Sequence, residues 1–101
     1  MAVAVIVSDT FGRAWRIGQT DVAIGLAGIS PFVDHTGKPD AQGREMTATR
    51  ICIADEMAGA AEMVMKKTAN ICAAIIRGAD VPWARGAATE IVRPPKDDLF
   101  R

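Results

Sequence analysis

Residues 49–67 read TRICIADEMAGAAEMVMKK, and this stretch predicts the one long helix of the chain. Its apolar residues recur at i, i+4, i+8 and i+11, which is one face of a helix with 3.6 residues per turn: Ile53, Met57, Ala61 and Val64. Thr49 is a candidate N-cap, and Lys66 and Lys67 at the end suit the negative pole of the helix macrodipole. We expect Asp55, Glu56 and Glu62 to form its solvated face.

Working outward, three apolar runs predict strands. Residues 2–7 and 71–76 are continuously apolar, as in strands buried on both faces. Residues 22–29 predict a strand with a bulge or a close backbone approach at Gly25 or Gly28. The fold class expected is α+β: a mixed or mostly antiparallel sheet with one main amphipathic helix packed on it. Because domains rarely begin on a buried strand, we expect upstream sequence or another chain to cover residues 2–7.

The remaining segments predict loops. Residues 11–21 have neither helical nor alternating periodicity, and glycines punctuate them. Residues 33–43 have the composition of a turn that joins antiparallel strands, and residues 79–89 are loop-like. No regular element can run across Pro94-Pro95 in the tail.

Composition limits the function. With 101 residues the chain is about one domain, taken here as 1–101. Twelve basic residues balance twelve acidic ones, which argues against nucleic-acid binding. No apolar run spans a membrane and no targeting segment is visible, so we expect a cytoplasmic protein.

Cys52 and Cys72 lie in apolar segments, which favours two reduced core thiols. Small apolar residues predict a modest core that relies on a partner surface or belongs to something larger.

Ser8, Asp9 and Thr10 follow the first apolar run. A carboxylate and a hydroxyl that emerge there together favour a hard cation such as Mg²⁺ or Mn²⁺, which takes oxygen ligands. The alternative, which the spacing alone favours, is a capped turn in which Asp9 or Thr10 accepts backbone N–H groups.

The predicted loop that follows is dense in recognition groups. Arg13 and Arg16 match phosphate or carboxylate oxygens, or are solvated surface arginines. Trp15 either packs on a flat ring system or anchors the loop. Gln19 and Asp21 add donors and acceptors. For Lys66 and Lys67 the alternatives are helix-dipole complementation and contact with a nucleotide phosphate.

These residues carry a resemblance to a known family. Residues 6–25 resemble the SDTFGRPWRxGQTDVAIG signature of the gamma-glutamyl ligases that extend the deazaflavin coenzyme F420. Residues 53–65 are similar to that family's ADELAAAAELVM helix, residues 73–78 to its AVVRG strand, and residues 92–101 to its VRPxxxDLFR terminus. The match runs in order along nearly the whole chain.

The resemblance implies a reaction. In that family GTP phosphorylates the terminal carboxylate of the deazaflavin F420-0, and the amino group of L-glutamate then displaces phosphate. GDP and phosphate are released, two divalent cations (Mg²⁺ or Mn²⁺) span the phosphates, and the subunits form intertwined dimers. The resemblance therefore implies that this chain is a ligase, and that it is a homodimer or partners a missing ligase half.

The resemblance also implies site residues. Asp9 and Thr10 match the family's metal ligands. The nucleotide-binding stretch carries over to four consecutive residues: Met65, Lys66, Lys67 and Thr68. The motif in residues 6–25 supplies candidates for binding substrate or phosphate: Arg13, Trp15, Arg16, Gln19 and Asp21. No catalytic residue is assigned.

The chain departs from the family pattern at several positions. Lys66 and Asn70 stand where the family's turn after the helix has glycines, Cys72 replaces a proline, and Ala14 replaces the proline of GRPWR. Family members are more than twice as long, so the chain resembles the C-terminal part of the ligase domain, without the N-terminal half. It then carries half of the metal and GTP site. The alternative is a non-catalytic binding or assembly module, a relic or split half that dimerises through residues 3–7.

Overall fold

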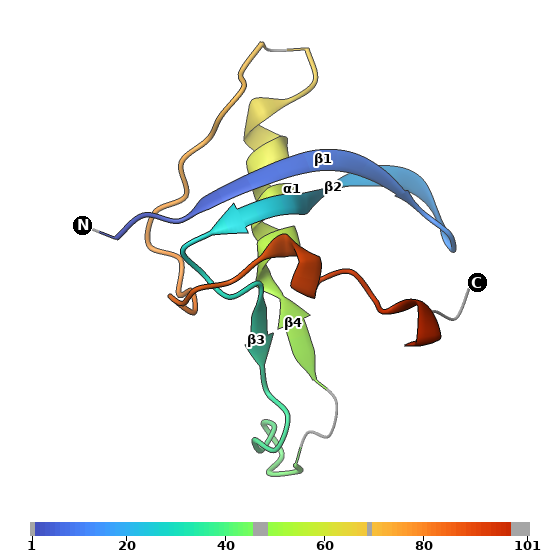
Figure 1. Cartoon of the computed structure of the whole chain (residues 1–101), viewed down its shortest axis with the longest axis vertical. Coiled ribbons are helices and arrows are strands. Elements are labelled where there is room, and N and C mark those ends of the chain that lie inside the picture. Colours follow the sequence, from blue (N-terminus) through green and yellow to red (C-terminus); the bar gives the residue numbers. More distant parts are fainter. Residues whose placement is uncertain (1, 46–48, 69, 98–101) are drawn as a thin grey trace.

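The computed structural model describes residues 2–45, 49–68 and 70–97. It holds two short antiparallel sheets and one main helix, which confirms the α+β expectation. Two 3-10 turns, Ala88–Glu90 and Pro95–Asp97, follow an irregular stretch. Figure 1 shows the helix crossing one side of the long hairpin. The elements in chain order are β1 (Val5–Arg13), β2 (Arg16–Ala27), β3 (Phe32–Asp34), β4 (Arg50–Cys52) and α1 (Ile53–Met65).

The β1–β2 hairpin corrects the prediction of a loop over residues 11–21. The strands stay paired from Val5↔Ala27 to Arg13↔Arg16, and only residues 14 and 15 turn at the tip. The polar side chains of this stretch are mostly exposed, so no apolar alternation marks it. Strand pairing uses backbone groups and does not require a buried face, which is why the sequence pattern missed it.

The predicted glycine features of β2 are confirmed. Val7 pairs with Gly25 but Ser8 pairs with Ala23, so Ile24 is an extra residue in a bulge beside Gly25. Gly28 has φ +92, and a Cβ there would lie 3.0 Å from the carbonyl oxygen of Val3. Only glycine combines that dihedral with that close approach.

Helix α1 is shorter than residues 49–67. Residues 50–52 form β4 and pair with β3, and Cys52 is the N-cap with no side-chain capping bond, so Thr49 is not the cap. The buried residues of α1 are Ala54 and Ala58, whereas Val64 of the predicted apolar face is 63% exposed. Small side chains on the inner face allow α1 to approach β2 closely.

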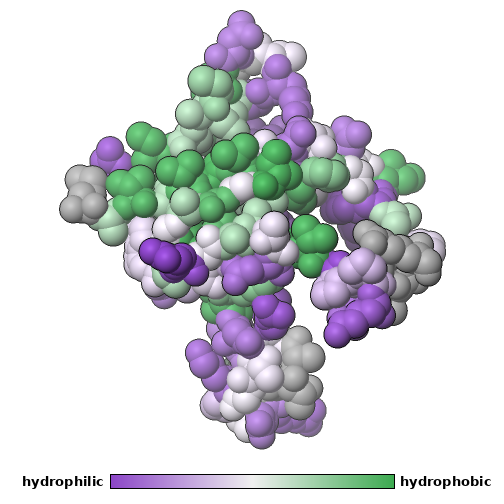
Figure 2. Space-filling model, in the orientation of Figure 1, coloured by the Kyte–Doolittle hydropathy of each residue, from purple (hydrophilic) through white to green (hydrophobic). Residues whose placement is uncertain are grey.

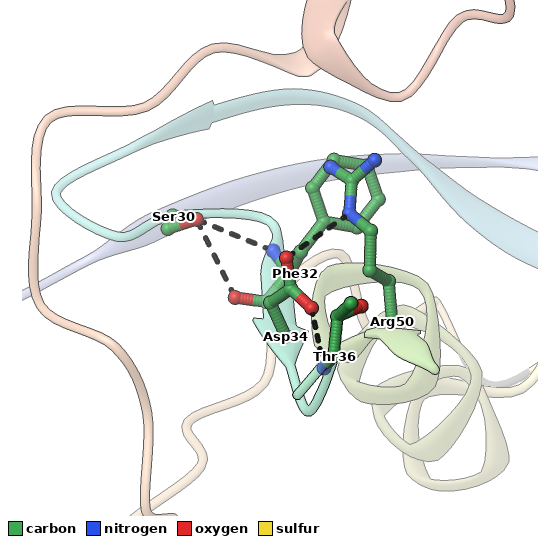
Figure 3. Close-up of polar contacts among 5 residues, drawn as sticks. All are labelled: Ser30, Phe32, Asp34, Thr36 and Arg50. Carbon is green, nitrogen blue, oxygen red and sulfur yellow. Dashed lines mark hydrogen bonds and ion pairs between the residues drawn. The ribbon is translucent and has the colours of Figure 1, made fainter. Parts of the chain in front are cut away.

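The β3–β4 pair carries its own polar network, drawn in Figure 3. The Thr36 backbone N–H donates to Asp34 Oδ1 at 2.9 Å, and Arg50 Nε lies 3.9 Å from Asp34 Oδ2. The Arg50 guanidinium stacks over the Phe32 ring, 4.0 Å from its centroid. These contacts hold the hairpin that leads the chain into α1.

The prediction of a strand over residues 71–76 is wrong. These residues are exposed and have no strand partner within the described part of the chain. Beyond them, the Ile29↔Trp83 bridge and the Ser30 N–H bond to the Pro82 carbonyl tie the chain back to the hairpin. In the tail no element spans Pro94-Pro95, as expected, and residues 98–101 lie outside the described residues.

The core is small, as the composition predicts. Among the described residues the buried hydrophobic side chains are Ala23, Ile29, Ala54 and Ala58. They lie between β2, α1 and the start of β3. Within residues 2–45, 49–68 and 70–97, no helix has the length and apolar character that crossing a membrane requires.

Candidate functional site

A polar cluster lies on the helix-facing side of the hairpin. Thr10 pairs with Asp21 in the register, and the Thr10 hydroxyl donates to Asp21 Oδ1 at 3.0 Å. The Ser8 hydroxyl donates to Asp21 Oδ2 at 3.4 Å. Asp21 is only 7% exposed, so its carboxylate is held by two hydroxyls out of most solvent contact. On the face of the hairpin that points toward α1, this part of the strands carries polar side chains where apolar ones would be usual.

Lys67 joins this cluster from the turn that follows α1. Its ammonium group donates a hydrogen bond to the Thr10 hydroxyl, across 57 residues of sequence. We call Ser8, Thr10, Asp21 and Lys67 the Asp21 cluster. It brings together the two segments to which the resemblance assigned metal and nucleotide binding.

The turn after α1 directs Lys67 toward β1. Lys66 is the C-cap with φ 56 and ψ 157, and its N–H donates to the Glu62 carbonyl oxygen at 2.9 Å. Asn70 also has a positive φ, 57. These two are the only non-glycine residues with positive φ among the described residues, and they are the positions where the resembling family has glycine. The chain therefore keeps a glycine-type backbone with bulkier residues.

The Asp9 carboxylate lies apart from the Thr10 hydroxyl. Neighbouring side chains of a strand point to opposite faces, and the burial pattern of β1 follows that alternation, with Asp9 exposed and Thr10 half-buried. Asp9 Oδ1 accepts the Thr10 backbone N–H at 2.8 Å. The segment is mid-strand, so neither a strand end nor a capped turn describes it. The metal role of Asp9 and Thr10 stays a prediction.

The side-chain atoms that the site offers are oxygens, which is the kind of ligand that a hard cation takes. Oxygen atoms from Ser8, Thr10 and Asp21 gather on one face, and Mg²⁺ and Mn²⁺ prefer oxygen ligands. No group of three or more His, Cys, Asp or Glu side chains suited to a metal ion occurs in the described ranges. The protein oxygens present here would therefore share such an ion with phosphate oxygens and water.

The other predicted site residues lie at the two ends of the cluster. Arg13, Trp15, Arg16 and Gln19 occupy the exposed tip of the hairpin, and Arg13 Nη2 donates to the Gly18 carbonyl oxygen at 3.5 Å. The 79% exposed Trp15 side chain sits in the tip turn, not in a core anchor. Met65 ends α1 and is half-buried, and Thr68 is exposed.

Two residues gained roles that the sequence analysis missed. Asp55 Oδ1 accepts the Ala23 backbone N–H at 2.9 Å, so this carboxylate holds α1 against β2 beside Asp21 and is not part of a solvated face. Ser8 completes the shell of Asp21. No spacing in the sequence points to the Asp55 contact, because it joins segments 32 residues apart.

The two cysteines lie in different environments, one partly buried and one exposed. Burial of Cys52 at the start of α1 raises the pKa of its thiol, which keeps it neutral. Cys72 is exposed, so the prediction of a core thiol is wrong for this residue. Its segment was expected in a sheet and lies instead on the surface.

Comparison with known proteins places this chain in a family. The family model for the F420-0:gamma-glutamyl ligase matches residues 1–78. Three similar relatives are each named coenzyme F420:L-glutamate ligase. The protein of Methanocaldococcus jannaschii is 43% identical over 100 residues, that of Methanothermobacter thermautotrophicus 43% over 104, and one of Methanococcus maripaludis 41% over 100.

Each of these alignments covers 98% of this chain and 40% of the relative. The chain thus spans about 40% of the length of the curated relatives that it matches. The aligned region covers nearly the whole chain, so it includes both segments that form the Asp21 cluster, the hairpin and the turn after α1. From the match of the family model over most of its residues and from this level of identity, the chain belongs to the F420-0:gamma-glutamyl ligase family.

Proposed function

We propose that this chain supplies part of the active site of a GTP-dependent coenzyme F420:L-glutamate ligase. In the first step a carboxylate oxygen of F420-0 attacks the γ-phosphorus of GTP, the β–γ P–O bond breaks, and GDP leaves. In the second step the glutamate nitrogen attacks the acyl carbon, loses a proton, and displaces phosphate. The product carries a new amide bond to L-glutamate. Family membership and the names of the relatives support this proposal.

One observation carries the assignment of the site. The Lys67 ammonium meets the Thr10 hydroxyl above the buried Asp21 carboxylate. A cation held beside hydroxyl and carboxylate oxygens suits the phosphates of a nucleotide, whose transfer requires little more than positioning and charge stabilisation. Lys66, Met65 and Thr68 flank Lys67 and are proposed to contact the nucleotide with it.

The hairpin tip is proposed to hold the anionic groups of the substrates. Arg13 and Arg16 present exposed guanidinium groups that can each grip a phosphate or carboxylate with two hydrogen bonds. Gln19 lies on the same strand between Arg16 and Asp21, and Trp15 offers a flat surface to the deazaflavin ring. These residues would position F420-0 and glutamate along the strands that carry Asp21.

Divalent cations have a defined place in the proposal. Asp9 and Thr10, whose side chains lie on opposite faces of β1, would each hold a different Mg²⁺ or Mn²⁺ ion, and such ions would neutralise charge on the phosphates of GTP. The remaining ligands come from the nucleotide, from water, and from the part of the ligase that lies outside this chain. Free cysteines and the use of GTP favour the cytoplasm as the compartment, and a homodimer or a complex with the remaining ligase part as the assembly.

Nucleotide binding tests the site. Calorimetric titration of GDP into the chain in the presence of Mn²⁺ or Mg²⁺ is expected to give binding that needs the metal. Lys67→Ala and Asp9→Ala are each expected to weaken that binding at least tenfold. Lys38→Ala, a matched surface lysine outside the cluster, is expected to bind within twofold of the parent chain.

Turnover tests the activity. Because the chain spans 40% of its relatives, we expect no GTP-dependent glutamylation of F420-0 by the chain alone, and glutamylation when the remaining ligase part is supplied. Turnover by the 101-residue chain alone would contradict this division of the site. Binding of GDP that Lys67→Ala leaves intact would contradict the site assignment. A folded chain that binds no nucleotide, with or without the remaining part, would support the assembly-module alternative.

A further inference from the structure

A groove runs beside the free edge of β1. It is a cavity of about 1090 Å³ whose walls are residues 2–7, the side of α1 that carries Met57 and Ala61, and residues 71–79. We call it the β1 groove. Figure 1 shows residues 71–79 leaving the end of α1 and passing back beneath the start of β1. In Figure 2 apolar side chains gather across the face where β1 lies.

Two walls of the groove are extended segments with nothing paired to them. On the described chain β1 pairs only with β2, which leaves its other edge open. Residues 71–77 are likewise without strand partners in that part of the chain. Residues 2–7 and 71–76 are continuously apolar, yet Val5 is 57% and Ile75 80% exposed. Open edges and exposed apolar strands of this kind are templates for another strand.

The whole chain exposes more surface than a compact protein of its mass. Its accessible surface is 8022 Å², whereas a compact monomer of 10.7 kDa exposes about 5,500 Å². The excess, on the order of 2,500 Å² on this chain, corresponds to about 5,000 Å² of interface counted over two partners, which lies in the upper range of obligate interfaces. The radius of gyration, 15.2 Å, also exceeds the roughly 13 Å of a compact 100-residue domain.

One end of the groove reaches the Asp21 cluster. Its lining includes Asp9, Asp21, Lys66 and Lys67 at the polar end, and apolar residues along the rest. An extended segment that fills the apolar length therefore ends beside the proposed phosphate site. The unpaired backbone of the two walls and the polar end beside the Asp21 cluster together indicate which kind of segment fills the groove.

We propose that the β1 groove accepts one extended, mainly apolar strand from the part of the ligase that lies outside this chain. The strand pairs through its backbone with the open edge of β1 and with residues 71–77, and it delivers residues to the Asp21 cluster. This is strand addition to a sheet edge, in which main-chain bonds give affinity and side-chain pockets give register. The inference rests on the proposed function only in assigning the strand to the remaining ligase part.

A second copy of this chain fits the groove less well. Its own residues 2–7 continue into the paired β1, and its residues 71–77 are held beyond by the Ile29↔Trp83 bridge. A symmetric contact between two β1 edges would pair the backbone groups of β1 but would leave those of residues 71–77 unpaired. A single inserted strand satisfies both walls at once.

Hydrogen exchange tests the proposal without any activity. The probe is the portion of the Methanocaldococcus jannaschii ligase that this chain does not match, supplied as a separate polypeptide and also joined to this chain in place of the matched 100 residues. In the chain alone we expect rapid exchange of the amides of residues 71–77 and of those amides in residues 4–7 that point to the open edge of β1, whereas the amides that bond to β2 are already protected. In the mixture or the fusion, the rapidly exchanging amides of both segments are expected to slow at least a hundredfold.

Other exchange patterns would overturn the proposal. Protection of both segments in the chain alone as its concentration rises would make the groove a contact between copies. Binding of the probe, or a folded fusion, without protection of either segment would place the remaining ligase part elsewhere. If the separate polypeptide did not bind and the two segments also exchanged rapidly in the fusion, no strand would occupy the groove. None of these readouts depends on GTP, so their failure is distinct from failure of the proposed function.

Matched variants locate the contact. Ile75→Lys puts a charge on the groove wall, and Ile17→Lys puts the same charge on the hairpin tip, where the side chain is fully exposed. We expect Ile75→Lys to weaken binding of the separate ligase part at least tenfold and Ile17→Lys to change it less than twofold. Equal effects of the two variants would contradict the proposal.

Discussion

Lys66 holds a backbone conformation that side chains disfavour. Lys66 combines φ 56 with ψ 157, a region populated almost only by glycine, and such a residue costs about 1–3 kcal/mol. Lys66→Gly is therefore expected to raise the free energy of unfolding by about 1 kcal/mol, after the added entropy of glycine in the unfolded chain. Urea denaturation measures the change.

The control for that substitution is Lys38→Gly, at a surface lysine whose φ is not positive. It is expected to leave stability unchanged or to lower it by up to about 0.5 kcal/mol. If Lys66→Gly lost as much stability as Lys38→Gly, up to about 0.5 kcal/mol, the lysine side chain at position 66 would contribute more to the fold than its backbone strain costs.

At the scale of the element, the packing of α1 on β2 depends on one carboxylate. Asp55 Oδ1 accepts the Ala23 N–H at 2.9 Å in a partly buried setting. Asp55→Ala leaves that N–H without a partner and is expected to lower the free energy of unfolding by about 1–3 kcal/mol. Its neighbour in the first turn of the helix, Glu56, is exposed, and Glu56→Ala is expected to change stability by less than about 0.5 kcal/mol. Thermal unfolding of the two variants side by side gives the comparison.

The β3–β4 hairpin is expected to loosen in acid. The Thr36 backbone N–H, with a smaller contribution from Arg50, lowers the pKa of Asp34 below its usual 3.8. A lowered pKa in the folded state means that the carboxylate form is favoured by folding. The stabilisation is therefore full above about pH 4 and is lost as the pH falls through the lowered pKa.

Amide exchange of Thr36 measures this effect. After correction for intrinsic rates, its protection at pH 6 is expected to exceed that at pH 2.5. Asp34→Asn should remove the difference, because asparagine does not titrate in this range. A pH dependence that survives in Asp34→Asn would assign the effect to another group.

At the scale of the whole molecule, the chain lacks the burial of a typical domain. Its buried hydrophobic residues within the described ranges include three alanines and one isoleucine. A compact domain of 100 residues unfolds with an enthalpy of about 60–80 kcal/mol at its midpoint. We expect roughly half that value from calorimetry of the chain alone, and an increase when the remaining ligase part is added. A full-sized enthalpy for the chain alone would mean that its exposed surface is covered without a partner.

The class of the fold and the family could be predicted from the sequence. The apolar repeat of residues 53–64 identified the helix through its period of 3.6 residues, although the residues that α1 buries, Ala54 and Ala58, are not members of that repeat. Gly25 marked the bulge in β2, and Gly28 marked the close approach directly after β2, where a positive φ and the nearby Val3 carbonyl oxygen leave room only for glycine. The resemblance of residues 6–25 to the ligase signature led to the family that the comparisons confirmed.

The pairing of segments distant in sequence was decided by tertiary structure. Strand pairing through backbone atoms extended β1 and β2 across residues 11–21, where no side-chain pattern marks a strand. The lack of a neighbour left residues 71–77 unpaired, although their composition is that of a buried strand. The meeting of Lys67 with Thr10, and of Asp55 with the Ala23 N–H, likewise depends on how the helix crosses the hairpin. Composition and periodicity record which surfaces a segment must bury, whereas the partner that buries them is set only when the elements pack.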